Sequence, residues 1–440
     1  MAALYGRPFF LRLVGRRAKY CSDFFVNTLI LNLQIMKYSL VTALILLSAC
    51  AKKSSPSTPV GPTDSATVTV INGYGSGTYK VGDTVDVWSR AIPSDSIFGT
   101  WTGYGALLSN AGEWHNTFIM PAANVTLTAS CSPLTAFSLK YEQIKGVNIL
   151  KNVYYYFPAT PKGIVYLCHG TGGSAQTLVN NFEWQEMIND LVNDSYAIVV
   201  TEAEEVSLNQ DLNGDGVIRW DLLPLDTLTN VDYGNIRVLT DTFYTRGYAQ
   251  PGIPRYSIGM SDGGAFSAAL SFVYTFAAGV SYCAPTSTVI TSSSVVPLQF
   301  CMAKYDNNPE VGAAGDATAQ GNSAALMARS VCSPFFLHDH SRVYPQRFAR
   351  WSGIGLSLSA SIYNELEANH WLDARNYLLA ASDTISARVT ANPSAYPVMS
   401  SLTVPQYTFV NNELDIMYAA HQFFSDYNKT TIQFLGAPCH

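Results

Sequence analysis

The feature that most constrains this chain is a serine flanked by glycines, G-M-S-D-G at residues 259–263. A short apolar run precedes it, and a segment rich in small residues follows it. A serine held on a sharp turn between a strand and a helix has a strained backbone, so the residues two before and two after it must lack colliding side chains. Gly259 and Gly263 meet that need. The pattern predicts a strand, a tight turn and a helix, with the Ser261 hydroxyl exposed at the corner.

A second glycine-rich motif, H-G-T-G-G at residues 169–173, follows a near-continuous apolar run typical of a strand buried on both faces. In such a loop the backbone N–H of Thr171 or Gly172 can approach a reacting group closely. The amide of Asp262, at the positive end of the helix expected after the serine, is a second donor. The two motifs together predict a site that stabilises a developing oxyanion beside the serine.

Beyond residue 134, apolar runs alternate with helical patterns, which is typical of a mostly parallel sheet covered by helices on both faces. With its two motifs, the segment 135–440 resembles an α/β-hydrolase of the esterase/lipase or polyester-depolymerase-like group. The resemblance implies a doubly wound sheet with a cap insertion, and hydrolysis of carboxylic esters through an acyl-enzyme. It also implies the chain order serine, acid, histidine, with the acid after a later strand and the histidine after the last strand.

The resemblance makes Asp306 the acid, because Asp306 closely follows the apolar run 298–303, which we expect to be the required strand. The alternative is that the Asp-Asn-Asn sequence only forms a turn, for which these side chains are equally suited. Glu310 is then the reserve candidate.

The resemblance makes His421 the base. We expect residues 407–410 to form the final strand, and His421 follows them in a loop. A lone histidine often has a structural role, so this position carries the assignment. His370 is the second candidate.

The segment between the acid and the histidine is much longer than in a minimal hydrolase. Insertions of this size commonly form lids or binding loops, so we expect a cap at about residues 312–402. Its aromatic residues are expected either to line a substrate cleft or to form the cap's own core. The insertion also leaves open that Asp339 or Asp373 supplies the acid.

Residues 211–216 resemble the start of a calcium-binding loop, with Asp211, Asn213 and Asp215 at the first, third and fifth positions and glycine at the sixth. The twelfth position is Leu222 in place of the bidentate glutamate. A structural Ca²⁺ site and a loop held by Asp and Asn turns are the two alternatives. No cofactor is otherwise expected.

The N-terminal part resembles a bacterial lipoprotein signal. Residues 36–49 hold a lysine, an apolar run and L-S-A before Cys50, which the resemblance makes the lipidated first residue. Residues 1–35 are then a leader from a mis-set start. A transmembrane helix over 24–47 is the alternative, but polar residues interrupt the roughly 20-residue apolar span it needs. We expect an anchored protein of the bacterial envelope, on the periplasmic face or the cell surface, or one released outside the cell.

Residues 50–65 are rich in Ser, Pro and Thr and are expected to form a tether. Residues 66–132 show short β-branched runs between Gly and Asn turns, which predicts a small all-β module. The module resembles the internalin-type B-repeat domain in three blocks: Y-K-V-G-D-T-V at 79–85, T-W-T-G at 100–103 and F-I-M-P-A-A-N-V-T at 118–126. It is either a spacer or an adhesive module. Exposure of Trp88 or Trp114 would favour adhesion, whereas Trp101 is expected in the core.

A net charge of −6 and only 13% charged residues argue against a nucleic-acid partner. Of the eight cysteines, two lie in the predicted leader and at the lipidated position, and the other six are an even set able to form disulfides outside the cytoplasm. Three of the six, Cys168, Cys283 and Cys301, are equally suited to be small buried hydrophobes.

We therefore expect an exported serine hydrolase acting on a small-molecule or polymeric ester, with its oligomeric state open. A peptidase or amidase of the same fold would share every motif. A non-catalytic surface-adhesion protein is the alternative from a different class.

Overall fold

The computed structural model describes residues 64–439, which belong to one compact unit spanning residues 62–440. The predicted leader, lipoprotein signal, Cys50 and almost all of the tether lie outside the described residues, as does the alternative helix over 24–47. Within residues 64–439, no helix has the length and apolar character needed to cross a membrane.

The first part of the described chain consists of strands, as the alternating β-branched residues predict. A four-stranded sheet has the order β3-β1-β7-β5, with β3 (Gly77–Lys80), β1 (Ser65–Ile71), β7 (Val125–Pro133) and β5 (Ser96–Gly103). A three-stranded sheet has the order β2-β4-β6, with β2 (Gly73–Tyr74), β4 (Thr84–Ser89) and β6 (His115–Ile119). We call residues 65–133 the β module.

The tryptophans of the β module are all buried. Trp101 is 2% exposed and lies in the core, as expected. Trp88 and Trp114 are 4% and 6% exposed, so neither offers the free aromatic face that adhesion would need. Both pack within the described chain, Trp88 against Tyr344 and Trp114 beneath Arg350.

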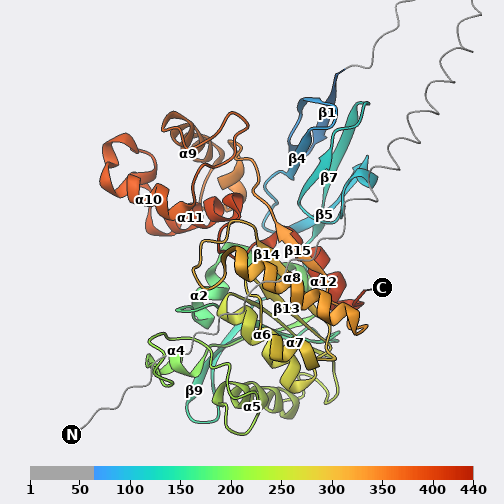
Figure 1. Ribbon diagram of the computed structural model, residues 1–440, viewed down its shortest axis with the longest axis vertical. Helices are drawn as coiled ribbons and strands as arrows, with labels where there is room; N and C mark the ends of the chain where they lie inside the picture. The colour runs from blue at the N-terminus through green and yellow to red at the C-terminus, as the bar shows by residue number, and fades with distance from the viewer. Residues whose placement is uncertain (1–63, 440) are drawn as a thin grey trace, which may run out of the picture. The chain divides into compact units, whose positions relative to one another are not determined.

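The remainder of the chain is built on an eight-stranded sheet of order β15-β14-β13-β12-β10-β11-β9-β8 (Figure 1). The strands are β8 (Lys140–Lys145), β9 (Leu150–Tyr156), β10 (Ile164–Cys168), β11 (Ala197–Val200), β12 (Arg255–Met260), β13 (Ala278–Tyr282), β14 (Leu298–Ala303) and β15 (Phe335–His338). Pairing is antiparallel between β8 and β9 and between β9 and β11, and parallel elsewhere. The mostly parallel sheet predicted from the alternating pattern is present.

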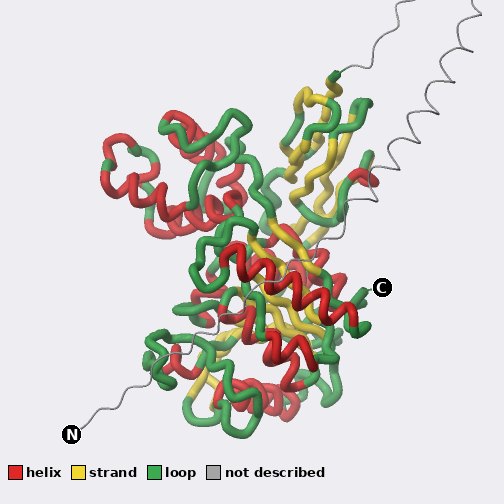
Figure 2. The backbone as a smooth tube through the Cα atoms, in the orientation of Figure 1, coloured by secondary structure: helices red, strands yellow, loops and turns green. Residues whose placement is uncertain are grey.

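Helices cover both faces of this sheet, and Figure 2 shows them in red around the yellow strands. One apolar core joins the sheet to α5 (Val231–Thr245), α6 (Asp262–Tyr274), α7 (Thr288–Ser293) and α8 (Gly312–Ala328). The other joins it to α2 (Ala175–Asn180), α3 (Phe182–Asn193) and α12 (Asn428–Gly436). The short helix α4 (Glu204–Leu208) follows β11. The sheet is therefore doubly wound.

The predicted cap range needs correction at its start. Both α8 and β15 belong to the sheet and its helical layer, so the insertion begins after His338 rather than at residue 312. It contains α9 (Leu356–Ala368), α10 (Ser382–Ala391) and α11 (Val404–Tyr418), which surround an apolar core of their own. We call residues 339–418 the cap.

The expected final strand at 407–410 is wrong, because these residues lie inside α11. Val410, Leu414 and Met417 are fully buried at helical spacing and pack in the cap core. The last strand of the sheet along the chain is β15, in a segment that we expected to belong to the cap.

The cysteines follow both of the expected patterns. Cys332 and Cys439 form a disulfide that spans 107 residues of sequence. Cys168, Cys283 and Cys301 are buried free thiols, whereas Cys131 is an exposed free thiol.

Candidate active site

Ser261 lies at the corner between β12 and α6, with φ 59° and ψ −129°. This left-handed φ is strained for a residue with a side chain. A Cβ at position 259 would overlap the carbonyl oxygen of Gly263, and a Cβ at position 263 would overlap the carbonyl oxygens of Cys168 and His169. The strand, turn and helix predicted around the serine are present, and the two glycines are there for the predicted reason.

The His421 ring lies between the serine and the predicted acid. Its Nε2 is 2.8 Å from Ser261 Oγ, and its Nδ1 is 2.7 Å from Asp306 Oδ2. The Asp306 side chain is fully buried, and its second oxygen accepts the backbone N–H of Asn308 at 2.9 Å. The carboxylate therefore favours the tautomer with the proton on Nδ1, which leaves Nε2 free to accept the serine proton.

The alternative acids and the second histidine candidate form no hydrogen bond or ion pair with Ser261, His421 or Asp306. Glu310 is exposed and pairs with Arg219. Asp339 pairs with Lys304 and His340, and Asp373 accepts backbone N–H groups of its own cap loop. His370 follows α9 in the cap. The structure brings together Ser261, His421 and Asp306, and leaves the reserves elsewhere.

The three predicted oxyanion donors have different surroundings. Within residues 64–439, the backbone amides of Thr171 and Asp262 have no hydrogen-bond partner. The amide of Gly172 donates to the carbonyl oxygen of Ile218 at 3.1 Å, so its prediction as a donor is wrong.

His169 holds the glycine-rich loop in place. Its Nδ1 donates to the Gly170 carbonyl oxygen at 2.7 Å, and its Nε2 accepts the backbone N–H of Ala203 at 3.2 Å. Burial lowers the pKa of His169 to about 4, so the ring is neutral and suited to donate once and accept once. Trp220 stacks on the ring and donates its indole N–H to the His169 carbonyl oxygen. His169 is therefore a structural residue of the loop.

The Asp262 carboxylate, next to the serine, has a related structural role. It accepts the backbone N–H of Trp220 at 2.9 Å, which ties the start of α6 to the segment beneath the loop. Burial raises the pKa of this carboxyl to about 7.

Sequence reasoning missed Asn308. Its Nδ2 lies 3.2 Å from His421 Nε2, while its Oδ1 accepts the backbone N–H of Glu310, which fixes the orientation of the amide. The Asp-Asn-Asn sequence could have indicated this contact, because the turn that positions Asp306 also places the next two side chains next to His421.

Cys283 is the second missed residue, and it follows β13 directly, at the edge where the parallel strands end. Cys283, Asp306 and His421 each place one potential metal-ligand atom so that the three atoms lie within 4.8 Å of one another. This spacing is also compatible with a bound metal ion. Burial raises the pKa of the Cys283 thiol well above its usual range, so the thiol stays protonated. In this arrangement His421 Nδ1 is bonded to the Asp306 carboxylate.

The loop that resembles a calcium site is held by its own side chains. Asp211 accepts the backbone N–H groups of Gly214 and Gly216 at 2.7 and 2.8 Å. Asp215 pairs with Arg219 at 2.7 Å. These contacts are those of a loop built from Asp turns, and the calcium site stays a prediction.

Comparison with known proteins gives weak likenesses. No family model and no curated protein matches the chain. A dienelactone hydrolase from Anabaena variabilis is 17% identical, with a TM-score of 0.33, over 45% of this chain and 84% of that protein. An α/β serine hydrolase without a lid from Xanthomonas campestris is 12% identical, with a TM-score of 0.33, over 47% and 86%. An esterase from Pyrobaculum calidifontis is 12% identical, with a TM-score of 0.32, over 54% and 87%.

Proposed function

We propose that this chain is a serine hydrolase that cleaves carboxylic esters through an acyl-enzyme. The observation that carries the proposal is the His421 ring, bonded to Ser261 Oγ through Nε2 and to a buried Asp306 carboxylate through Nδ1. A nucleophile, a base and a group that orients the base are the components that acyl transfer requires.

In the first half-reaction, His421 Nε2 takes the Ser261 proton while Oγ attacks the ester carbonyl carbon. The amides of Thr171 and Asp262 donate to the resulting oxyanion, and each such donor lowers the barrier by about 3 kcal/mol. Nε2 then gives its proton to the departing alkoxide, which leaves as the alcohol. Asp306 keeps the imidazolium oriented and compensates its charge.

In the second half-reaction, His421 Nε2 takes a proton from water, and the hydroxyl attacks the acyl-enzyme carbonyl. The same two amides stabilise the second oxyanion. The proton returns from Nε2 to Ser261 Oγ as the carboxylic acid is released. No step needs a metal or an organic cofactor, so we expect activity to persist in the presence of EDTA.

The test compares Ser261→Ala with Ser292→Ala, a control at an exposed serine on α7. We expect Ser261→Ala to lose p-nitrophenyl acetate hydrolysis and the control to keep it. Ester hydrolysis by Ser261→Ala at the wild-type rate would overturn the proposal. A panel of aryl esters, an insoluble polyester and peptide substrates separates an esterase from a peptidase or amidase.

We also propose that the protein is exported and anchored in the cell envelope through a lipidated Cys50. The disulfide between Cys332 and Cys439 supports a compartment outside the cytoplasm. Expression from Met36 in a bacterium fed radiolabelled palmitate tests the anchor. We expect label on the wild-type chain and none on Cys50→Ala; equal labelling of both would contradict it.

A further inference from the structure

A groove with a volume of about 620 Å³ runs between the β module and the cap. Its module wall includes Tyr79 and Asp83, and its cap side includes Arg342, Arg375 and Tyr377. This volume falls within the range of small-molecule binding sites. The groove is separate from Ser261 and His421, and nothing in the proposed chemistry uses it.

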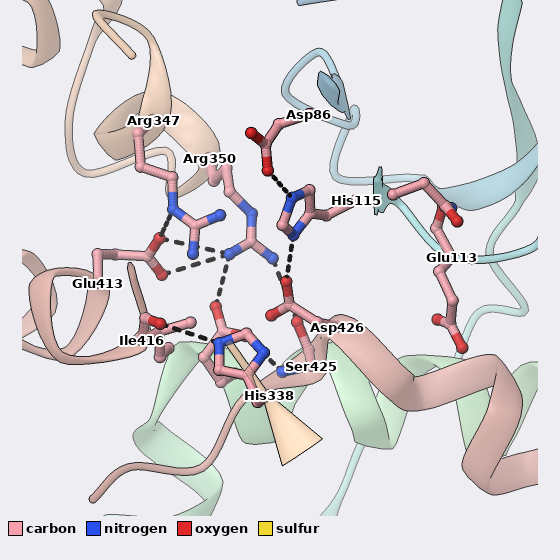
Figure 3. Close-up of polar contacts among 12 residues, drawn as sticks. Asp86, Glu113, His115, His338, Arg347, Arg350, Glu413, Ile416, Ser425 and Asp426 are labelled. Carbon is pink, nitrogen blue, oxygen red and sulfur yellow. Dashed lines mark hydrogen bonds and ion pairs between the residues drawn. The ribbon is translucent and has the colours of Figure 1, made fainter. Parts of the chain in front are cut away.

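Buried polar contacts hold the module wall of this groove in place. Figure 3 shows His115 between two carboxylates, with Nδ1 2.7 Å from Asp426 and Nε2 3.5 Å from Asp86. Asp86 also pairs with Arg342 of the cap at 3.2 Å. Charges buried to this degree are strongly destabilising unless they stay paired, so separating the module would carry a large penalty.

A second set of contacts joins the module to α12 and the cap. The carboxylate of Glu113 accepts the backbone N–H groups of Lys429 and Thr430 at 3.2 and 2.7 Å, at the N-terminal end of α12. The guanidinium of Arg350 lies 3.7 Å from the centre of the Trp114 ring. The module is thus built into the compact unit, so the groove is a preformed site rather than a gap beside a loose spacer.

The side chains in the groove suit a neutral ligand with many hydroxyl groups. Its cationic and acidic residues balance in number: Lys80, Arg342 and Arg375 against Asp83, Asp86 and Asp339. Asp86 is paired with Arg342, and Asp339 is paired with Lys304 and His340. The groove therefore has no excess charge to attract an ionic ligand, while Lys80, Asp83 and Arg375 offer donors and acceptors to hydroxyl groups. Tyr79 and Tyr377 also line the groove and add apolar ring carbons, and the Arg342 guanidinium lies over their rings at 5.8 and 5.6 Å. Pyranose rings combine hydroxyl edges with apolar C–H faces.

A line of aromatic rings runs from the groove to Tyr305, the residue that precedes Asp306 in the chain. The His340 ring, on the groove, lies 4.3 Å from Tyr377 and 5.4 Å from Tyr305. Tyr305 is 40% exposed and immediately precedes Asp306. A chain in the groove would have these rings as its route towards the loop that carries Asp306.

We propose that the groove binds the saccharide chain of an ester-substituted glycan, so that the site removes acyl groups carried on a polysaccharide. This inference rests on the proposed esterase function and names its substrate class. It assigns the β module a direct part in substrate binding, in place of the spacer or free adhesive role expected from the sequence.

A binding measurement tests the groove without relying on turnover. Ser261→Ala protein is titrated calorimetrically with neutral hexasaccharides of xylose, glucose, mannose and N-acetylglucosamine. We expect at least one to bind, and the added substitutions Arg375→Ala or Tyr79→Ala to weaken that binding about tenfold. Tyr104→Ala is the matched control, because Tyr104 is an exposed tyrosine of the same module outside the groove.

Binding of none of the four saccharides, or binding that both groove substitutions leave unchanged, would overturn the inference. So would binding of an unstructured peptide in their place. Arg375 is exposed, so its substitution tests the groove even if Tyr79→Ala, which loses a hydrogen bond to Gly75, weakens the module.

A kinetic comparison adds the link to catalysis in the otherwise wild-type enzyme. Arg375→Ala is expected to raise KM for acetylated xylan or acetylated glucomannan about tenfold and to leave p-nitrophenyl acetate hydrolysis unchanged. Equal effects on the polymeric and the small ester would contradict the inference. A wild-type protein inactive on every ester would instead refute the proposed function, and the calorimetric result would still decide whether the groove binds saccharide.

Discussion

Replacing Asp306 by asparagine is the substitution whose effect the structure predicts in most detail. One carboxylate oxygen of Asp306 accepts the backbone N–H of Asn308, and the other accepts the proton on His421 Nδ1. In Asp306→Asn the amide oxygen stays opposite the Asn308 N–H, because the NH₂ group cannot accept that bond. The NH₂ group then faces Nδ1 and makes it an acceptor, which places the ring proton on Nε2.

An imidazole with its proton on Nε2 cannot take the proton of Ser261. The wrong tautomer costs about 10⁴-fold in kcat in Ser-His-Asp enzymes, which corresponds to about 5.4 kcal/mol of barrier. The overall fold should persist, because asparagine has the shape of aspartate and keeps the bond to the Asn308 N–H.

The assay is kcat for p-nitrophenyl acetate, with the thermal unfolding midpoint measured on the same preparations. Asp316→Asn is the control, since Asp316 is a nearby acid on α8 whose pKa burial raises to about 6. We expect the control to keep nearly wild-type kcat. A loss of less than about tenfold in Asp306→Asn, with the fold intact, would refute the role assigned to the acid.

Two predictions concern stability. The double substitution Cys332→Ser and Cys439→Ser removes the disulfide. It should lower the free energy of unfolding, measured in urea, by up to about 4.8 kcal/mol, which is the loop-closure value for a separation of 107 residues. An unchanged free energy of unfolding would contradict the pairing. Burial acts to lower the pKa of His115, but hydrogen bonds to Asp426 and Asp86 outweigh it and leave the pKa raised. Protonated His115 therefore stabilises the folded state. This contribution is complete below the unfolded-state pKa of about 6.5 and is lost as the pH rises through the higher folded-state pKa. The stability gap between wild type and His115→Gln should therefore shrink as pH rises, and a gap that widens would show the opposite.

The corner at Ser261 was predictable because its constraint is local. Five residues specify a turn whose glycines have no room for a Cβ, and the flanking patterns supply the strand and the helix. The position of Asp306 after β14 followed in the same way from a short apolar run.

His421 was predicted from a false premise, since the four residues taken as a final strand are helical. A four-residue apolar window does not separate strand from helix. The deciding signals were Thr403 and Gln406, which form a capping box, and the proline in the first turn of α11. The true last strand, β15, escaped notice because Pro334 and a cysteine precede a short, half-exposed apolar run.

The docking of the β module could not be predicted from the sequence. The bond between His115 and Asp426 joins residues 311 positions apart, and each of the two is unremarkable in its own segment. The same holds for Trp88 and Trp114, whose burial depends on cap residues that no local pattern links to them.

The central claim is that Ser261 is an activated nucleophile. The most direct measurement is mass spectrometry of the protein after treatment with a fluorophosphonate, which reacts covalently with activated serines. The account predicts one adduct, mapped to the peptide that carries Ser261, and its loss in Ser261→Ala. An unmodified wild-type protein, or an adduct on another serine, would contradict it.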